Sequence, residues 1–456
     1  MARTRKLSDS DTNADGAKKP KTLTSPFRHH LETIDVKKLD FDQEKICSVT
    51  LSPLNVYCCL VCGKFLQGRG ENSVAFLHSI QEDHHVFMNL NTKSTYVLPE
   101  NNEVPEDPAL QRIRYAICPS YTKEDLATYP RRCFDMANNL YLNGFVGFIE
   151  PKNTSHLTVV LQLLAHISPL RDHLALISTE DSSTELLKRL STIVKKLWSP
   201  YLFRTHVSPH EFLHQLAVSN RAPLKADPKN FLLWLVNHMN ACDAGLKKVL
   251  TKTLRGEINM ATTAIREEST EDAEKNMKFV KDESSTSTKK LKFWTLSLDL
   301  PPMPLFTDGF DTNSIPQVGI ESLLEKFMGA REIHTKEGIK KYTLSKLPKY
   351  LLLHVDRFNG DAELPIKTRN QTLVKFPETL KINGRNFRVI MNLTHDAIKG
   401  KYTEDKEIDY ESQWKAQILE PKDQQWYELD GKTVTLKEKE LLFLSESYLQ
   451  VWEALD

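Results

Sequence analysis

Residues 59–90 read CLVCGKFLQGRGENSVAFLHSIQEDHHVFMNL, and this stretch decides how the first part of the chain folds. Cys59 and Cys62 are separated by two residues, His78 follows after fifteen more, and His84 after another five. Two thiolates from a tight turn and two imidazoles from a helical segment and its end complete a tetrahedral zinc site. We therefore predict one structural zinc ion bound by these four side chains.

Neighbouring residues leave the exact ligand set open. Cys58 lies beside Cys59, His85 lies beside His84, and Cys47 is nearby. The alternative interpretation is that these side chains only pack in a core, as free cysteine often does. A site with four protein ligands is closed to substrate, so we expect a structural role and not a catalytic one.

Composition narrows the classes of function. The chain has 456 residues, with 61 Lys and Arg against 60 Asp and Glu, so its formal net charge is +1. This balance argues against a bulk electrostatic nucleic-acid binder, although a local basic patch remains possible. Seven cysteines, several of them in one short segment, suit a reducing compartment and a metal site. No run of about 18 apolar residues is present, so we expect no membrane span.

The chain divides into three parts by composition. Residues 1–25 are polar and basic with few apolar groups, which predicts a disordered tail carrying either a nuclear-import signal or a simple solvated charge cluster. Residues 26–130 are rich in His, Cys and aromatic residues, and they form the first folded part. From residue 131 to residue 456, helical patterns come first and strand patterns later, which indicates an α+β domain.

Periodicity places the main elements of this second domain. Apolar spacing predicts helices over 154–170, 183–197, 209–218 and 228–239. Apolar runs predict strands over 293–298, 350–355, 387–393, 414–419 and 448–452. The charged residues 265–290 predict an exposed insertion.

Several motifs resemble a known family. The segments Cys59–Gly70, Leu77–His78 and Asp83–Leu90 resemble the ubiquitin-protease (UBP) type of zinc finger. The later motifs that resemble the ubiquitin-specific protease domain are Gly144–Gly147, Val160–Gln162, Asn230–Leu232, Leu296–Pro301, Leu347–Leu351, Asp356–Phe358, Val374–Pro377 and Trp426–Asp430. The resemblance implies a UBP-type zinc finger over 26–130. A papain-like ubiquitin-specific protease fold, with a helical lobe and an antiparallel sheet lobe, would follow over 131–456.

The resemblance also implies where a nucleophile would lie. Active members place a cysteine in Gly-Asn-Thr-Cys, ahead of a helix that ends in Val-Leu-Gln. Counting back from residues 160–162 puts Ser155 at the position of the cysteine and Asn153 at that of the oxyanion-hole amide. A serine hydroxyl without a base is a poor nucleophile. The structural alternative is that Ser155 caps the N-terminus of the helix, with His156 beyond it.

The base position departs from the family pattern too. The family places its histidine thirteen residues before the tryptophan that corresponds to Trp426, and here that residue is Gln413. Asp430 matches the acid that orients the histidine in active members. Glutamine cannot accept a proton at neutral pH, so we predict that the domain is a pseudo-enzyme. Among the other histidines, His156 and His395 are candidates to replace the base, and we expect both to be structural.

Two further departures concern ubiquitin binding. Active members often carry paired cysteine knuckles in a fingers subdomain, whereas residues 250–295 contain no cysteine. In ubiquitin-reading zinc fingers an arginine after Cys-Gly holds the carboxylate of ubiquitin, and here Lys64 follows Gly63. Lysine lacks the bidentate fork of arginine.

The combination resembles the branch of the family that works in splicing. It implies a nuclear, catalytically inactive scaffold that assembles or stabilises the spliceosomal tri-snRNP through protein contacts. Small nuclear RNA would be contacted mostly indirectly, because the sequence has no RNA-recognition fingerprint. The alternatives are a reader of ubiquitin or a ubiquitin-like protein, and a weak deubiquitinase that uses Ser155.

Overall fold

A computed structural model describes most of the chain: residues 27–177, 184–219, 227–268, 278–302, 315–335, 338–358, 369–402 and 408–455. The tail predicted over 1–25 lies outside these residues. The chain divides into two compact units, Met1–Leu39 with Glu44–Leu110, and Asp40–Gln43 with Gln111–Asp456. None of the described helices is both long enough and apolar enough to span a membrane.

The division comes earlier than the boundary predicted at residue 130. Residues 111–130 belong to the second unit because their aromatic side chains pack there. The Tyr121 hydroxyl donates to the backbone carbonyl of Lys195 at 2.7 Å, and the Tyr115 ring lies edge-on to Tyr201. These contacts are long-range in sequence, so composition alone does not reveal them.

The first unit is a five-stranded antiparallel sheet in the order β2-β1-β3-β4-β5. Its elements are α1 (Arg28–Leu31), β1 (Val56–Cys59), β2 (Phe65–Gln67), α2 (Val74–Gln81), β3 (Val86–Asn89), β4 (Thr95–Val97) and β5 (Asn102–Glu103). Ser73 caps α2 by accepting the N–H of Phe76. One cluster of its apolar core is formed by the buried residues Tyr57, Cys59, Leu66, Ala75, Phe87 and Leu98.

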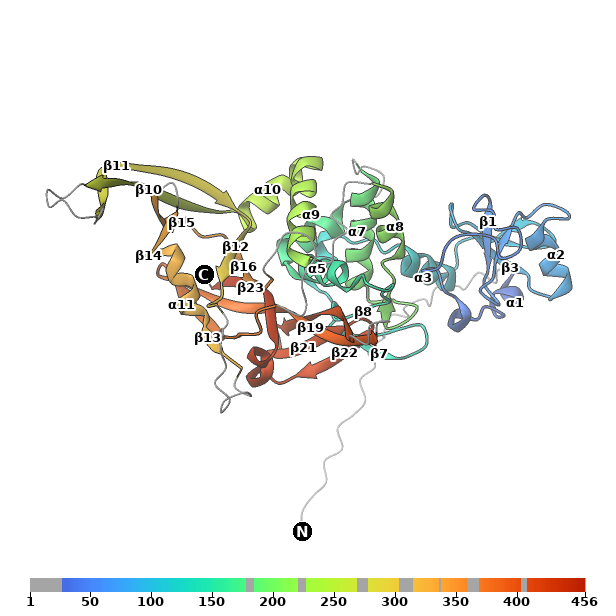
Figure 1. Ribbon diagram of the computed structural model, residues 1–456. Helices are drawn as coiled ribbons and strands as arrows, with labels where there is room; N and C mark the ends of the chain where they lie inside the picture. The colour runs from blue at the N-terminus through green and yellow to red at the C-terminus, as the bar shows by residue number, and fades with distance from the viewer. Residues whose placement is uncertain are drawn as a thin grey trace, which may run out of the picture. The chain divides into compact units, whose positions relative to one another are not determined.

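The second unit begins with a helical part, shown in green in Figure 1. Its helices are α4 (Lys123–Ala127), α5 (Ser155–His166), α6 (Ser168–Leu176), α7 (Glu185–Leu197), α8 (His210–Val218), α9 (Pro228–Cys242) and α10 (Ala244–Thr253); α3 (Pro108–Ile117) precedes them and α11 (Ile320–Leu324) comes later. The sequence pattern predicts one apolar face for α5, but every residue from Ser155 to Ala165 is buried. A helix buried on all sides is the centre of a core.

An eight-stranded sheet covers one side of α5. The strand order is β12-β16-β23-β19-β20-β21-β22, with β18 paired to β19. The strands are β12 (Thr295–Asp299), β16 (Tyr350–Asp356), β18 (Thr379–Ile382), β19 (Arg385–Tyr402), β20 (Ile408–Glu420), β21 (Gln425–Asp430), β22 (Thr433–Lys437) and β23 (Glu446–Leu455). All pairs are antiparallel except β12 with β16. The α+β class predicted from the sequence is confirmed.

A second sheet contains the charged segment that follows α10. Its order is β11-β10-β15-β14, formed by β10 (Gly256–Glu268), β11 (Lys278–Phe293), β15 (Gly338–Lys346) and β14 (Met328–Thr335). Figure 1 shows β10 and β11 as a long hairpin. Residues 265–290, predicted as an exposed insertion, therefore form paired strands in their described part. The remaining short strands are β6 (Arg132–Phe134), β7 (Leu140–Leu142), β8 (Gly147–Phe148), β9 (His206–Val207), β13 (Gln317–Gly319) and β17 (Leu373–Lys375).

Candidate metal centre and protease-like site

The structure brings the four predicted metal ligands of the first unit together. Cys59 ends β1, Cys62 lies in the turn after it, His78 is on α2, and His84 precedes β3. Their ligand atoms all lie within 4.8 Å of one another. The Cys62 Sγ to His78 Nε2 distance is 3.4 Å, and His78 Nε2 lies 3.1 Å from His84 Nδ1.

These distances fit a tetrahedral zinc ion. Bonds of about 2.3 Å to sulfur and about 2.0 Å to nitrogen place neighbouring sulfur and nitrogen ligands about 3.5 Å apart, and two nitrogens about 3.3 Å apart. The Cys59 thiol hydrogen-bonds to Cys62, and this bond, with contacts from the Lys64 backbone and the two histidines, holds the pKa of Cys62 well below its usual range. A thiolate is the form of cysteine that binds a metal.

The turn after Cys59 requires a glycine. Gly63 has a φ of +79°, and its N–H donates to the Cys59 carbonyl at 2.8 Å. A Cβ at this position would lie 2.3 Å from the carbonyl oxygen of Lys38. Any other residue would therefore strain the turn that presents Cys62 to the other ligands.

The three neighbouring residues that the sequence left open make other contacts. Both ring nitrogens of His85 are engaged, Nδ1 with the Leu98 carbonyl at 2.7 Å and Nε2 with Asp83 at 2.9 Å. Cys58 is fully buried and contacts the backbone next to it, and Cys47 accepts two backbone N–H groups of the loop that follows it. The described cluster consists of the four residues first predicted.

In the second unit, Ser155 is the first residue of the buried helix α5. Its side chain is buried, with the residue only 4% exposed, and its Oγ accepts the backbone N–H of Trp414 at 3.3 Å. The interpretation of Ser155 as the N-cap is wrong, because Thr154 occupies the cap position. Ser155 instead joins the start of α5 to β20.

Gln413 lies on β20, next to Trp414, and faces Asp430. Its Nε2 donates to Asp430 Oδ1 at 2.9 Å. The Lys415 ammonium lies 3.3 Å from Asp430 Oδ2 and 2.7 Å from Asp396 Oδ2. The Asp430 carboxylate is therefore bound by one amide and one cation. In the described part of the chain, no imidazole is hydrogen-bonded to Asp430 or to Ser155.

Sequence reasoning did not find Glu150, which completes this polar cluster. Burial raises its pKa, the negative charge of Asp430 adds to the effect, and hydrogen bonds from Thr158 and Gln413 oppose it. An amide nitrogen carries two N–H donors, so Gln413 can serve both carboxyl groups. No motif in the sequence marks Glu150, and only the folded chain places it near Gln413.

The two histidines considered as replacement bases are buried and engaged elsewhere. His156 donates to the backbone of Asn153, and burial lowers its pKa to about 4. His395 Nε2 lies 2.9 Å from Ser412 Oγ, and its ring is in edge contact with Trp414. Asn153 itself is exposed in the left-handed region, with a φ of +60°.

Comparison with known families gives two matches. Residues 46–109 match the family described as "Zn-finger in ubiquitin-hydrolases and other protein". Residues 146–452, about two thirds of the chain, match the family described as "Ubiquitin carboxyl-terminal hydrolase". The two matches occur in the predicted order, and they confirm the family resemblance.

Named relatives align over almost the whole chain. The pre-mRNA-splicing factor SAD1 of Saccharomyces cerevisiae is 41% identical over 98% of each chain. Human ubiquitin carboxyl-terminal hydrolase 39 is 33% identical over 94% of this chain and 80% of its own length. A solved structure described as an essential yeast splicing factor is 39% identical, with a TM-score of 0.78 over 94% of this chain and 100% of the other. The chain therefore belongs to the ubiquitin carboxyl-terminal hydrolase family, among the members that carry a UBP-type zinc finger and resemble splicing factor SAD1.

Proposed function

We propose that this protein is a catalytically inactive, ubiquitin-protease-like scaffold in pre-mRNA splicing. The observation that carries the proposal is the 41% identity with a named pre-mRNA-splicing factor over 98% of both chains. The scaffold acts in the nucleus and assembles or stabilises the tri-snRNP through protein contacts. Small nuclear RNA associates mostly through those protein partners.

Inactivity follows from the residues at the two reactive positions. Ser155 stands where active members have cysteine, and its buried Oγ accepts a backbone N–H instead of facing a base. Gln413 stands where they have histidine, and its amide donates to Asp430. An amide that donates to carboxylates cannot accept a proton from a nucleophile, so the general-base contribution of about 10²–10⁴-fold is lost.

The zinc finger has a structural role in this proposal. One zinc ion is held by Cys59, Cys62, His78 and His84, whose donor set and spacing suit that metal. The ion stabilises the fold of the first unit, because a site that exists only in the folded chain converts binding free energy into folding free energy. Such a finger gives the scaffold a rigid second surface.

A tagged pull-down from nuclear extract at moderate salt, with sequencing of the recovered RNA, tests the role. We expect spliceosomal small nuclear RNAs to dominate and to disappear at higher salt. The variant His84→Ala should reduce recovery, and His85→Ala, which removes a neighbouring imidazole outside the cluster, should not. Recovery of free or conjugated ubiquitin without small nuclear RNA would contradict the scaffold role and favour a ubiquitin reader.

A further inference from the structure

Helix α10 leads directly into the long hairpin of β10 and β11 (Figure 1), and the chain around this junction is strongly basic. Residues 244–262, 286–294 and 338–346 contain ten lysines and arginines but only one acidic residue, Glu257. These segments therefore carry nine more positive than negative charges, whereas the net charge of the whole chain is +1. Such an uneven distribution gives one part of a balanced molecule a positive field.

The helical part of this basic surface is a stripe along α10. Lys247, Lys248 and Lys252 are all exposed. Leu246 and Leu250 are buried on the other side of the helix, as a repeat of 3.6 residues requires. Lys248 and Lys252 are four residues apart, so they are separated by about 6 Å along the helix axis.

Arg255 joins the helical stripe to the hairpin. It follows Lys252 by three residues, and its guanidinium lies 5.5 Å from the centre of the Trp294 ring. Stacking on an indole holds a guanidinium in place and leaves its N–H donors for an anion. Within the described part of the chain, no carboxylate is paired with this guanidinium.

The strand part of the surface lies on one face of the sheet β11-β10-β15-β14. Lys292 on β11 and Lys346 on β15 are the two cross-strand neighbours of Glu257. Lys290 precedes Lys292 by two residues, so the two share a face and are about 6.6 Å apart. Glu257 can neutralise only one of its two neighbours, so this face keeps a positive charge.

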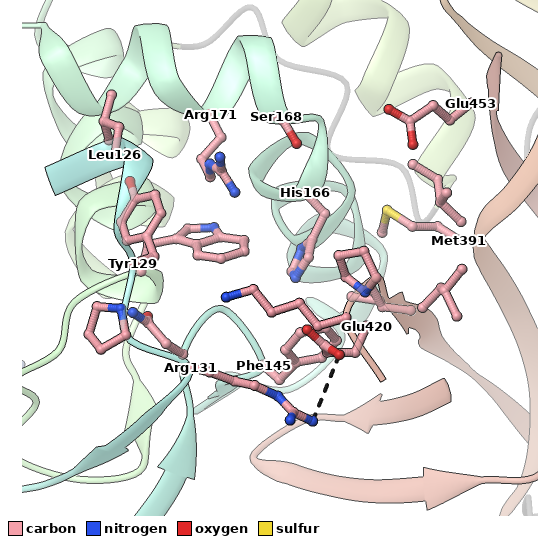
Figure 2. A pocket seen from close by; sticks show the side chains of 18 of the residues that line it. Leu126, Tyr129, Arg131, Phe145, His166, Ser168, Arg171, Met391, Glu420 and Glu453 are labelled. Atoms are coloured by element: carbon pink, nitrogen blue, oxygen red, sulfur yellow. Dashed lines mark ion pairs between the residues drawn. The ribbon is translucent and has the colours of Figure 1, made fainter. Parts of the chain in front are cut away.

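The members of this surface lack counter-ions. We call them the basic ridge: Lys247, Lys248, Lys252, Arg255, Lys290, Lys292 and Lys346. None of them forms an ion pair among the described residues. A cavity of about 370 Å³ at the C-terminal end of α5 shows the contrast, because there Arg131 lies 3.8 Å from the Glu420 carboxylate, as the dashed line in Figure 2 marks. Like charges without partners repel one another, and an anionic ligand relieves that repulsion.

The composition of the basic ridge favours a nucleic-acid backbone over an acidic protein as the ligand. Lysine is depleted in protein–protein interfaces, whose centres are apolar and aromatic. Among the described side chains of residues 244–293 and 338–346, no large apolar one is exposed. Protein–nucleic acid interfaces are more polar and much more positive. Cations repeated about every 6–7 Å along a helix and a strand also suit an anion whose charge repeats along its length.

We infer that the basic ridge binds the phosphate backbone of a nucleic acid without reading its sequence. Each lysine pairs with a phosphate as a point charge, and the planar guanidinium of Arg255 can hold one phosphate through two N–H groups. Contacts of this kind position a strand but do not specify its bases. The ridge recognises phosphates only, and that the strand is RNA rests on the proposed role in splicing.

Fluorescence anisotropy of a labelled oligouridine, titrated with the full chain at several salt concentrations, tests the inference. The logarithm of the association constant should fall linearly with the logarithm of the salt concentration, with a slope of about −0.7 for each phosphate contact. The triple variant Lys290→Gln, Lys292→Gln and Lys346→Gln removes three contacts. Its slope should be shallower by about 2, and its affinity at about 0.1 M salt should be about 100-fold lower.

The matched control is the triple variant Lys123→Gln, Lys381→Gln and Lys432→Gln. These lysines are exposed, lie outside the basic ridge and form no ion pair among the described residues, so the net charge changes by the same amount. The control should bind oligouridine as the parent does. Both triple variants should melt within a few degrees of the parent, because only exposed side chains change. The basic residues of the tail over 1–25 are common to all three chains and add an equal background.

Two results of the titration would overturn the inference: equal affinities of the parent and the ridge variant, or equal losses in the two triple variants. Displacement of oligouridine by polyglutamate at the same concentration of charges would also overturn it, and would favour an acidic protein segment as the ligand. The pull-down from nuclear extract tests the scaffold role separately, so a failure of either proposal is recognised on its own.

Discussion

Loss of one zinc ligand should release the metal and unfold only the first unit. The decisive comparison is His84→Ala against His85→Ala, because the two histidines are adjacent but differ in their contacts. His84 Nδ1 lies 3.1 Å from His78 Nε2 in the ligand cluster. His85 is bound to the Leu98 carbonyl and to Asp83 instead.

The expected magnitude follows from the number of ligands. A structural zinc site supplies about 10–16 kcal/mol of apparent binding free energy, so each of four ligands accounts for about 2.5–4 kcal/mol. Removing His84 should therefore weaken zinc binding about 10²–10³-fold. His85→Ala loses two ordinary hydrogen bonds and should leave zinc affinity within about threefold of the parent. Complete chelation should unfold the first unit, since the binding free energy of a structural zinc site is folding free energy for a small domain.

The distribution of tryptophan makes the two units separately observable. All six tryptophans lie between residues 198 and 452, within the second unit. We expect chelation to leave tryptophan fluorescence and its thermal transition unchanged, while amide hydrogen exchange of residues 56–97 rises sharply. Zinc affinity is measured by competition with a chromogenic chelator. Equal zinc affinities for His84→Ala and His85→Ala, or a metal-free finger with unchanged exchange, would refute the assignment.

Four further predictions concern the second unit. The parent chain and the Ser155→Ala variant should show the same background rate on a fluorogenic ubiquitin substrate. Gln413→Ala should lower the free energy of unfolding of the second unit by about 1–3 kcal/mol in urea titrations, because Asp430 loses a hydrogen-bond donor. Although burial opposes its charge, hydrogen bonds from basic neighbours lower the pKa of Glu446 to about 2. The ionised form of Glu446 therefore stabilises the fold fully above about pH 4.5. Glu446→Gln should lower the free energy of unfolding by about 3 kcal/mol at pH 7, and by less than half of that amount at about pH 3. Arg357 is fully buried and donates to three backbone carbonyls. Replacing it with methionine should lower the free energy of unfolding by more than about 3 kcal/mol, as measured by urea unfolding followed by tryptophan fluorescence.

Local signals predict the elements of this protein well. The spacing of Cys59, Cys62, His78 and His84 is set by one turn and one short helix, so sequence distance translates directly into spatial distance. The order of helices before strands similarly predicts the α+β class, because each pattern depends on neighbouring residues.

Contacts between distant segments were not predictable in the same way. The sequence favoured Ser155 as a helix cap, yet its hydroxyl accepts an N–H from Trp414, which lies 259 positions away. Glu150 has no signature because its partners are on α5 and β20. The charged residues 265–290 look like a loop by composition, but backbone pairing between β10 and β11 orders their described part as strands.

The polar cluster around Gln413 stabilises the fold at the position where the family resemblance places a histidine. Two carboxyl groups, Glu150 and Asp430, face the same position on β20 and need donors. A neutral histidine has one N–H, whereas a glutamine amide nitrogen has two, and Lys415 adds a cation beside Asp430. A glutamine amide therefore satisfies the two carboxyl groups better than a single imidazole N–H would, and its hydrogen bonds secure β20 against its neighbours.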